Sequence, residues 1–419
     1  MKGKLDVSWQ NIEGLLLALT PFFRNYRIPY VDMNLATFLF LIMISVDLFN
    51  RVCLKKKNAD DFSKSVALLV LICMTDYMLI EYVLIDVMKI GSYATAGNFS
   101  GLLLYLFEIW GLLFVFSDAS LRAKFRKKVI EITLFMCFVI LIQYLLYYLF
   151  DIALTRSFFV PFNGLCEQSV TEVLSQSSMV MNGLFRPSAF FLEPSHFAAY
   201  AVIALGILLF ENDKKINRKA IFITVSILMT TSGLGMAASM LLWGIKALEF
   251  LSSKNRLRLR NTLIVCFAAL CVFIVLYFSV DPFQRAVNRV LISDNQNAIT
   301  GRLWTSFLLD KLSGVDIYLG LGFRNRPVSE YSGSVYYMTG SVEMLYCQGL
   351  IGMVIFTTLM VIAVYRMWKK KDILNFSIIC VFIAWFMLGN IINPYYLVKY
   401  LPFTFHEADI DTTKEQLIN

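Results

Sequence analysis

The sequence predicts an all-α membrane protein, a polytopic helical bundle with about 11 transmembrane helices and two large external loops. Hydrophobic residues make up 58% of the 419 residues and charged residues only 16%, and the mean hydropathy is +0.65. A soluble domain carries about 25% charged residues, so this chain has too little polar surface to cover water-soluble cores. Apolar runs of about 20 residues, the length that crosses a bilayer, recur along the chain.

The apolar runs locate the expected spans in order. The run 220–250 is too long for one helix and carries Thr230-Thr231-Ser232-Gly233 near its middle, which predicts two short helices meeting at a break near Ser232. The first run lacks a small-residue cleavage site and leads into further spans, so we expect no cleaved signal peptide. The expected spans are 8–23, 35–49, 65–85, 101–117, 129–150, 197–210, 220–250, 262–280, 350–368 and 373–392.

Orientation follows from lysine and arginine. Five short connections hold 22 of the 38 basic residues, and the positive-inside rule makes these connections cytoplasmic. The long alternate connections are then external. The cytoplasmic connections are 51–64, 120–128, 211–219, 251–260 and 366–372.

These assignments divide one integral membrane domain, 1–419, into consecutive parts. The long loops are where function usually lies in a compact membrane protein. The parts are N-terminal helices 1–150, a first large external loop 151–196, central helices 197–280, a second large external loop 281–349, C-terminal helices 350–392 and a tail 393–419.

The charge and cysteine content exclude other classes of protein. The net charge of +8 lies mostly in short clusters between apolar runs, which is typical of membrane orientation signals and not of a nucleic-acid partner. The cysteines include no CxxC pair and no histidine at ligand spacing, so we expect neither a disulfide framework nor a metal site. Five of the eight lie inside apolar segments: Cys73, Cys137, Cys266, Cys271 and Cys380.

The segment from Arg186 to Phe197 is the most distinctive local feature, because it places Arg, Glu and His immediately before an apolar helix. Pro194 suits the first position of that helix, whose N-terminus favours an anion. Glu193 and His196 are three residues apart and are candidates for a general base or proton shuttle. Alternatively, Glu193 caps the helix and His196 packs at the membrane interface.

In the second loop the basic residues are mostly arginine, whose planar fork binds phosphate and carboxylate. Arg285 and Arg289 are four apart and would share one helix face as a phosphate clamp. An exposed amphipathic helix paired with Asp281 or Asp294 explains the same spacing.

Later in the same loop, a tight turn at Gly320-Leu321-Gly322 is expected to present Arg324 and Arg326. Trp304 and Tyr337 offer flat faces that stack on sugar rings, although interfacial aromatic belts use the same residue types.

Taken in order, these motifs resemble the Wzy-type polysaccharide polymerases, within the broader O-antigen ligase-like group. The resemblance covers the chain from about Arg186 onward, while the N-terminal spans match only in hydropathy. The motifs that carry it are Arg-Pro-Ser-x-Phe-x-x-Glu-Pro-Ser-His-Phe-Ala at 186–198, Thr-Thr-Ser-Gly at 230–233, Gly-Arg-x-Trp at 301–304, Gly-Leu-Gly-Phe at 320–323 and Cys-Gln-Gly-Leu-Ile-Gly at 347–352.

The resemblance implies a glycosyltransferase on the outer face of the bacterial cytoplasmic (inner) membrane that needs no metal, nucleotide or other cofactor. It would polymerise undecaprenyl-pyrophosphate-linked oligosaccharide repeat units of an O-antigen, capsule or exopolysaccharide. Its implied partners are the lipid-linked glycans, the bilayer, a chain-length regulator and a flippase.

Site residues follow from the same match. By the resemblance, the catalytic residues would be Arg186, Glu193, His196 and Arg302. Charge and position, or an aromatic face, add a second set for pyrophosphate and glycan binding: Arg285, Arg289, Arg324, Arg326, Trp304 and Tyr337.

Two other functions stay open. An O-antigen ligase-like transferase usually shows a histidine before the final Gly-Leu-x-Gly, but the region 338–341 here reads Met-Thr-Gly-Ser. A flippase or transporter of lipid-linked sugars would use charged residues inside spans, such as Asp76, Glu81 and Glu108. Those three would otherwise be polar groups that face the bundle, and the chain shows no internal repeat typical of transporters.

Overall fold

The computed structural model describes residues 2–24, 26, 28, 33–53, 62–91, 99–152, 180–181, 184–191, 193–211, 217–251, 277–279, 284, 288, 304–323, 325, 338–389 and 393–406. These residues are mostly helical, as predicted, with one short antiparallel hairpin.

Helices lie at every predicted span except 262–280, most of which lies outside the described residues. The helices are α1 (Lys2–Phe23), α2 (Leu35–Val52), α3 (Ala67–Tyr82), a π-helical turn (Val83–Val87), α4 (Phe99–Val115), α5 (Ala119–Phe150), α7 (Pro194–Phe210), α8 (Arg218–Met229), α9 (Gly233–Leu251), α13 (Asp316–Leu319), α14 (Gly340–Lys369), α15 (Ile373–Leu388) and α16 (Pro394–Leu397). The 3₁₀ helices are Phe62–Lys64, Trp304–Lys311 and Leu401–Thr404, and the strands are β1 (Val180–Met181) and β2 (Leu184–Phe185).

Four helical stretches are long and apolar enough to cross a membrane: Ala67–Val87, Ala119–Phe150, Gly233–Leu251 and Gly340–Lys369. Shorter apolar helices accompany them in α4, α7 and α15. The chain therefore has the helices of a membrane protein, while the total of about 11 spans and their orientation stay predictions.

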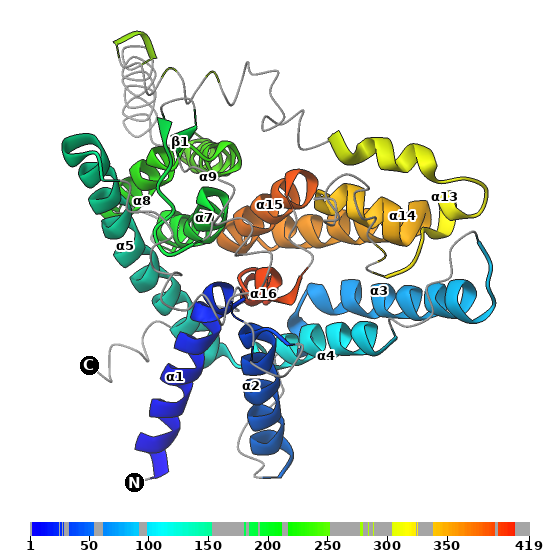
Figure 1. Cartoon of the computed structure of the whole chain (residues 1–419). Helices are drawn as coiled ribbons and strands as arrows, with labels where there is room; N and C mark the ends of the chain where they lie inside the picture. The colour runs from blue at the N-terminus through cyan, green and yellow to red at the C-terminus, as the bar shows by residue number, and fades with distance from the viewer. Residues whose placement is uncertain are drawn as a thin grey trace.

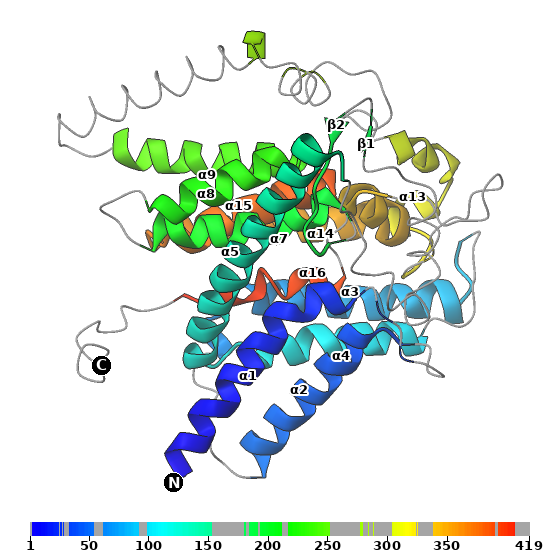
Figure 2. The same ribbon diagram turned by 60° about the vertical axis from the view of Figure 1, so that its left-hand side comes forward.

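The helix α7 is the centre of the bundle. Every residue from Phe197 to Phe210 is buried, and a helix that is apolar on all sides is one enclosed by others. It packs against α5, α8, α9 and α15. The short helix α16 lies between this group and the group formed by α1 to α4, and both views show it near the middle of the molecule (Figure 1, Figure 2).

The predicted break in the run 220–250 is confirmed, because α8 ends at Met229 and α9 begins at Gly233. Thr230 donates its hydroxyl to the carbonyl of Ile227 at 2.7 Å, and the hydroxyl of Ser232 accepts from the N–H of Gly235 at 3.3 Å. A side chain at Gly235 would overlap Ala198 of α7. The glycine thus lets the start of α9 pack closely on the first turns of α7.

Two predicted boundaries were wrong. The segment 120–128, expected to be a connection, forms the first turns of α5, where the Asp118 side chain accepts from the N–H groups of Ser120 and Leu121. Lysine and arginine are good helix formers, so a basic cluster does not by itself end a helix. Similarly, α14 begins ten residues before the expected start at 350 and bends at Gly349, where φ is +63°.

The structure brings several basic connections to one end of the bundle, which we call the basic end. Lys64, Arg366 and Lys370 line one pocket together with His406. Arg122, at the start of α5, lies 4.6 Å from the centre of the Phe405 ring. These contacts join segments that the positive-inside rule assigns to the same side.

Residues 393–406, which open the segment predicted as a tail, pack in the interior. Val398, Phe403 and Phe405 are fully buried, and Phe405 bridges to Ser65. The segment ends at the basic end, where His406 lies 3.3 Å from Asp372. The chain after α15 is therefore part of the core as far as residue 406.

Candidate functional site

The first turn of α7 presents the candidate acid–base residues Glu193 and His196. The other end of α7 lies toward the basic end, because Gly206, late in α7, packs on Ile378, early in α15 and shortly after the basic connection 366–372. The first turn of α7 therefore lies away from the basic end. Pro194 occupies the first helical position, as predicted. Glu193 stands at the cap position but makes no capping hydrogen bond, and its Oε2 instead accepts from Ser195 Oγ at 3.0 Å. The Glu193 side chain is exposed.

Arg186 joins the first-loop motif to the break between α8 and α9. Its side chain is half-buried, and its Nε donates to Thr231 Oγ1 at 3.2 Å. Thr231 has a φ of +52°. Two motifs that are 45 residues apart in the sequence therefore meet at one place.

The segment after Arg186 is held against α5. Gln143 Oε1 accepts from the N–H of Ala189 at 3.0 Å, and Gln143 Nε2 donates to the carbonyl of the same residue at 3.3 Å. Ser188 Oγ donates to the carbonyl of Phe191 at 2.8 Å. Before this turn, the Phe185 ring of β2 stacks on Tyr147 at 4.5 Å between centroids. These contacts restrict the position from which Arg186 reaches Thr231.

His196 lies in a cluster with Tyr396, Arg24 and Lys399, none of which the sequence analysis predicted as site residues. Its ring centroid lies 5.8 Å from that of Tyr396 in α16. Arg24, just after α1, donates a hydrogen bond to the Tyr396 hydroxyl, and its guanidinium lies 4.8 Å from the centre of the same ring. Lys399 Nζ lies 4.9 Å from that centre on the Tyr396 ring face. The available signal was that both cations stand outside the five basic connections.

The second loop is described only in part. Trp304 begins the 3₁₀ helix Trp304–Lys311. The other second-loop candidates lie outside the described residues: Arg285, Arg289, Arg302, Arg324, Arg326 and Tyr337.

The glycines before Arg324 form the predicted tight turn, with φ of +79° at Gly320 and +92° at Gly322. The N–H of Gly322 donates to the carbonyl of Cys347 at 2.9 Å. A side chain at Gly320 would overlap the backbone of Cys347 and Gly349. The Gly-Leu-Gly-Phe motif therefore docks on the Cys-Gln-Gly motif at the bend of α14.

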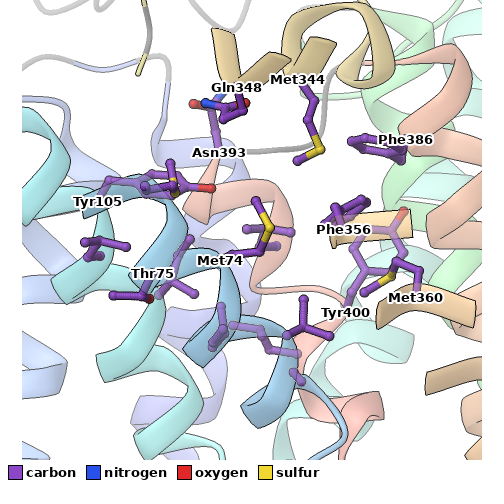
Figure 3. Close-up of a pocket in the computed structure, with 18 of the residues that line it drawn as sticks. Met74, Thr75, Tyr105, Met344, Gln348, Phe356, Met360, Phe386, Asn393 and Tyr400 are labelled. Atoms are coloured by element: carbon purple, nitrogen blue, oxygen red, sulfur yellow. The ribbon is translucent and has the colours of Figure 1, made fainter. Parts of the chain in front are cut away.

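An apolar cavity of about 140 Å³ lies between α3, α4, α14, α15 and the segment 393–404. Figure 3 shows Gln348 and Asn393 on one side of it, while Met74, Met344 and Phe356 line its middle. A dry apolar cavity of about 150 Å³ holds a group the size of benzene. The cavity is therefore large enough for a short stretch of an apolar chain.

The acidic residues inside the spans behave differently from one another. Glu81 and Glu108 are buried, exposing 1% and 4% of their surface, as expected of groups facing the bundle. Asp76 is exposed on α3, so the alternative of a polar group that faces the bundle does not fit this residue.

No protein-family model matches this chain, and no curated protein matches its sequence. The functional assignment therefore rests on the residues of the chain and on the way the fold brings them together.

Proposed function

We propose that the chain is a glycosyltransferase that polymerises undecaprenyl-pyrophosphate-linked repeat units on the outer face of the bacterial cytoplasmic membrane. The observation that carries the proposal is the contact between Arg186 and Thr231, 3.2 Å long. It joins the Arg-Pro-Ser motif to the Thr-Thr-Ser-Gly break, near the helix that presents Glu193 and His196. The resemblance in motif order is thus supported by proximity in space.

The reaction needs a base for the acceptor and cations for the leaving group. Glu193 or His196 takes the proton from the acceptor hydroxyl, and the hydroxyl oxygen attacks C1 of the donor sugar. The bond between C1 and the phosphate oxygen breaks, and the pyrophosphate leaves with the electron pair. Arg186 and the N-terminal N–H groups of α7 favour the negative charge that develops there.

A gene deletion tests this proposal against its alternatives. Loss of a polymerase leaves lipid-linked single repeat units on the outer leaflet and removes the ladder of longer glycans. Loss of a ligase-like transferase leaves long glycans on the lipid carrier. If single units accumulate only on the cytoplasmic leaflet, the chain is a transporter and the polymerase proposal fails. The buried Glu81 and Glu108 would support that alternative.

A further inference from the structure

Two lysines show how this fold treats a buried positive charge. Lys246 and Lys399 each expose 1% of their surface. Lys246 Nζ lies 5.0 Å from the centre of the Phe250 ring and forms an ion pair with Glu249 at 2.8 Å. Lys399 Nζ also lies over an aromatic ring, but its polar contact is the carbonyl of Ala199 at 3.4 Å. Within the described ranges, no carboxylate pairs with Lys399.

Two arginines repeat the contrast. Arg51 lies 4.2 Å from the centre of the Phe114 ring and forms an ion pair with Asp47 at 2.7 Å. Arg24 lies 4.7 Å and 4.8 Å from the centres of the Tyr395 and Tyr396 rings. As far as the structure describes the chain, Arg24 has no acidic partner.

Arg24 and Lys399 are therefore two cations on the same tyrosine, Tyr396, and neither is matched by an acid in the described part of the chain. Taking a charge out of water costs several kcal/mol unless an opposite charge compensates for it. An ionisable group within a membrane bundle accordingly points to a functional site. A cation–π contact offsets only part of this desolvation cost. An anion bound beside Arg24 and Lys399 would offset more of it.

The surroundings add to the positive potential. Tyr396 contacts the ring of His196, in the first turn of α7. Lys399 reaches the carbonyl of Ala199, about one turn further along the same helix. The N-terminal turn of a helix carries unpaired N–H groups and the positive end of its dipole. The nearly complete burial of Lys399 distinguishes this helix start from an ordinary one.

An apolar cavity borders the same segment. Tyr400 lines the cavity, and the centre of its ring lies 5.9 Å from Lys399 Nζ. An anion held at Arg24 and Lys399 would therefore lie near room for an apolar chain. This arrangement suits a phosphate that is attached to a lipid.

We propose that Arg24, Lys399 and the start of α7 bind a phosphate-bearing anion, namely the diphosphate of a polyprenyl lipid. The half-buried Arg24 supplies hydrogen bonds through its fork, and Lys399 supplies a second charge 4.9 Å from the centre of the Tyr396 ring. The identity of the lipid rests on the proposed function, whereas the need for an anion rests on the unmatched cations.

Binding is measured on the full chain in phosphatidylcholine nanodiscs, with undecaprenyl pyrophosphate as the probe. Arg24→Gln and Lys399→Met should each weaken binding by about tenfold or more, the worth of a hydrogen bond or ion pair to a charged group. Lys246→Met is the matched control, and its affinity should stay within about twofold of the wild type. Wild-type affinity in both Arg24→Gln and Lys399→Met would overturn the proposal.

Competition identifies the source of the anion. Displacement of the probe by inorganic pyrophosphate supports recognition of the diphosphate itself. Displacement by phosphatidylglycerol in the nanodisc, and not by pyrophosphate, supports an anion site for lipid phosphates in general. Displacement by neither, with unchanged affinity in the variants, shows that the lipid chain alone is bound and contradicts the anion site.

Thermal stability provides a second test that does not need the probe. Lys399→Met removes a buried charge that no carboxylate in the described part of the chain offsets, so the empty protein should melt at the same or a higher temperature. Lys246→Met leaves Glu249 without its lysine and should melt lower. A lower melting temperature for Lys399→Met than for the wild type would show that the lysine serves the fold, and the proposal would fail.

The two proposals fail separately because the binding assay involves no polymer. If the wild-type protein binds the probe but makes no ladder, and Arg24→Gln loses the binding, the anion site is supported and the polymerase proposal is contradicted. Normal ladders and normal binding in both Arg24→Gln and Lys399→Met contradict the anion site and leave the polymerase proposal standing.

Discussion

Arg186 Nε donates a hydrogen bond to Thr231 Oγ1 across 3.2 Å, and Thr231 has a φ of +52°. A β-branched residue rarely adopts this left-handed conformation, which costs about 1–2 kcal/mol. Such strain persists only where the surroundings hold it, and it is frequent at functional sites. Here the arginine and the hydroxyl groups of the break supply that support.

The first prediction concerns this contact. Thr231→Val keeps the shape of the side chain but removes the acceptor of Arg186, so polymer formation should fall by about tenfold or more. Thr231→Ser retains the hydroxyl and should stay near the wild type. The measurement is the glycan ladder made by membranes supplied with lipid-linked repeat units. Equal ladders from the two variants would mean that the contact has no role in turnover.

The second prediction separates charge from fork geometry at the arginines. Arg186→Ala and Arg302→Ala should abolish polymer while protein levels in the membrane stay normal. Arg186→Lys should rescue poorly, since an ammonium supplies charge without two parallel hydrogen bonds. Lys128→Ala is the control, because its ion pair with Glu131 is exposed and weak. Full activity of Arg186→Lys would show that a point charge suffices.

The third prediction concerns the base. Glu193→Gln should reduce turnover by a factor of about 10² to 10⁴, the usual worth of a positioned general acid or base. Stability should hardly change, because Glu193 is exposed and glutamine keeps its size. Ser195→Ala, which removes the hydroxyl donor to Glu193, should reduce turnover much less.

His196→Asn complements the base test. It should lose as much turnover as Glu193→Gln if His196 is the base, and less if His196 only orients the acceptor. Near-normal ladders from Glu193→Gln would show that Glu193 only precedes the first turn of α7 and takes no part in catalysis. The assay is the same ladder, with protein level checked by blot.

The fourth prediction compares two glycines of the second loop. Gly320 and Gly314 both have positive φ, at +79° and +57°, so alanine is strained at either position. At Gly320 the new methyl group also overlaps the backbone of Cys347 and Gly349, whereas Gly314 has open space around it. Gly320→Ala should therefore lower the melting temperature and polymer output far more than Gly314→Ala. Equal effects would show that the loop does not depend on this docking.

The fifth prediction concerns orientation. Reporters fused near Lys56, Lys215 and Lys370 should read as cytoplasmic, because lysine and arginine bias sets the topology. Reporters near Asn163 and Asn325 should read as external. An external signal from any two of the basic connections would place the candidate site on the wrong side of the membrane for a polymerase.

The sequence by itself determined where the helices lie. A helix in a bilayer must satisfy its own backbone hydrogen bonds, so an apolar run of the right length is a local and sufficient signal. The break at Thr230 to Ser232 and the helix start at Pro194 were also local, since turn-forming residues and proline act on their own backbone. The start of α5 was predicted at 129 instead of Ala119, because basic residues set topology without ending a helix.

Only the tertiary structure decided which distant residues share a site. Arg24, His196 and Lys399 lie in three separate parts of the chain, and they meet because Tyr396 contacts all three. Nothing in the local pattern marks such a meeting, since each cation alone looks like an isolated charge beside an apolar run. Packing of α16 and the residues after it into the interior removes Lys399 from solvent, and that burial makes the cluster informative.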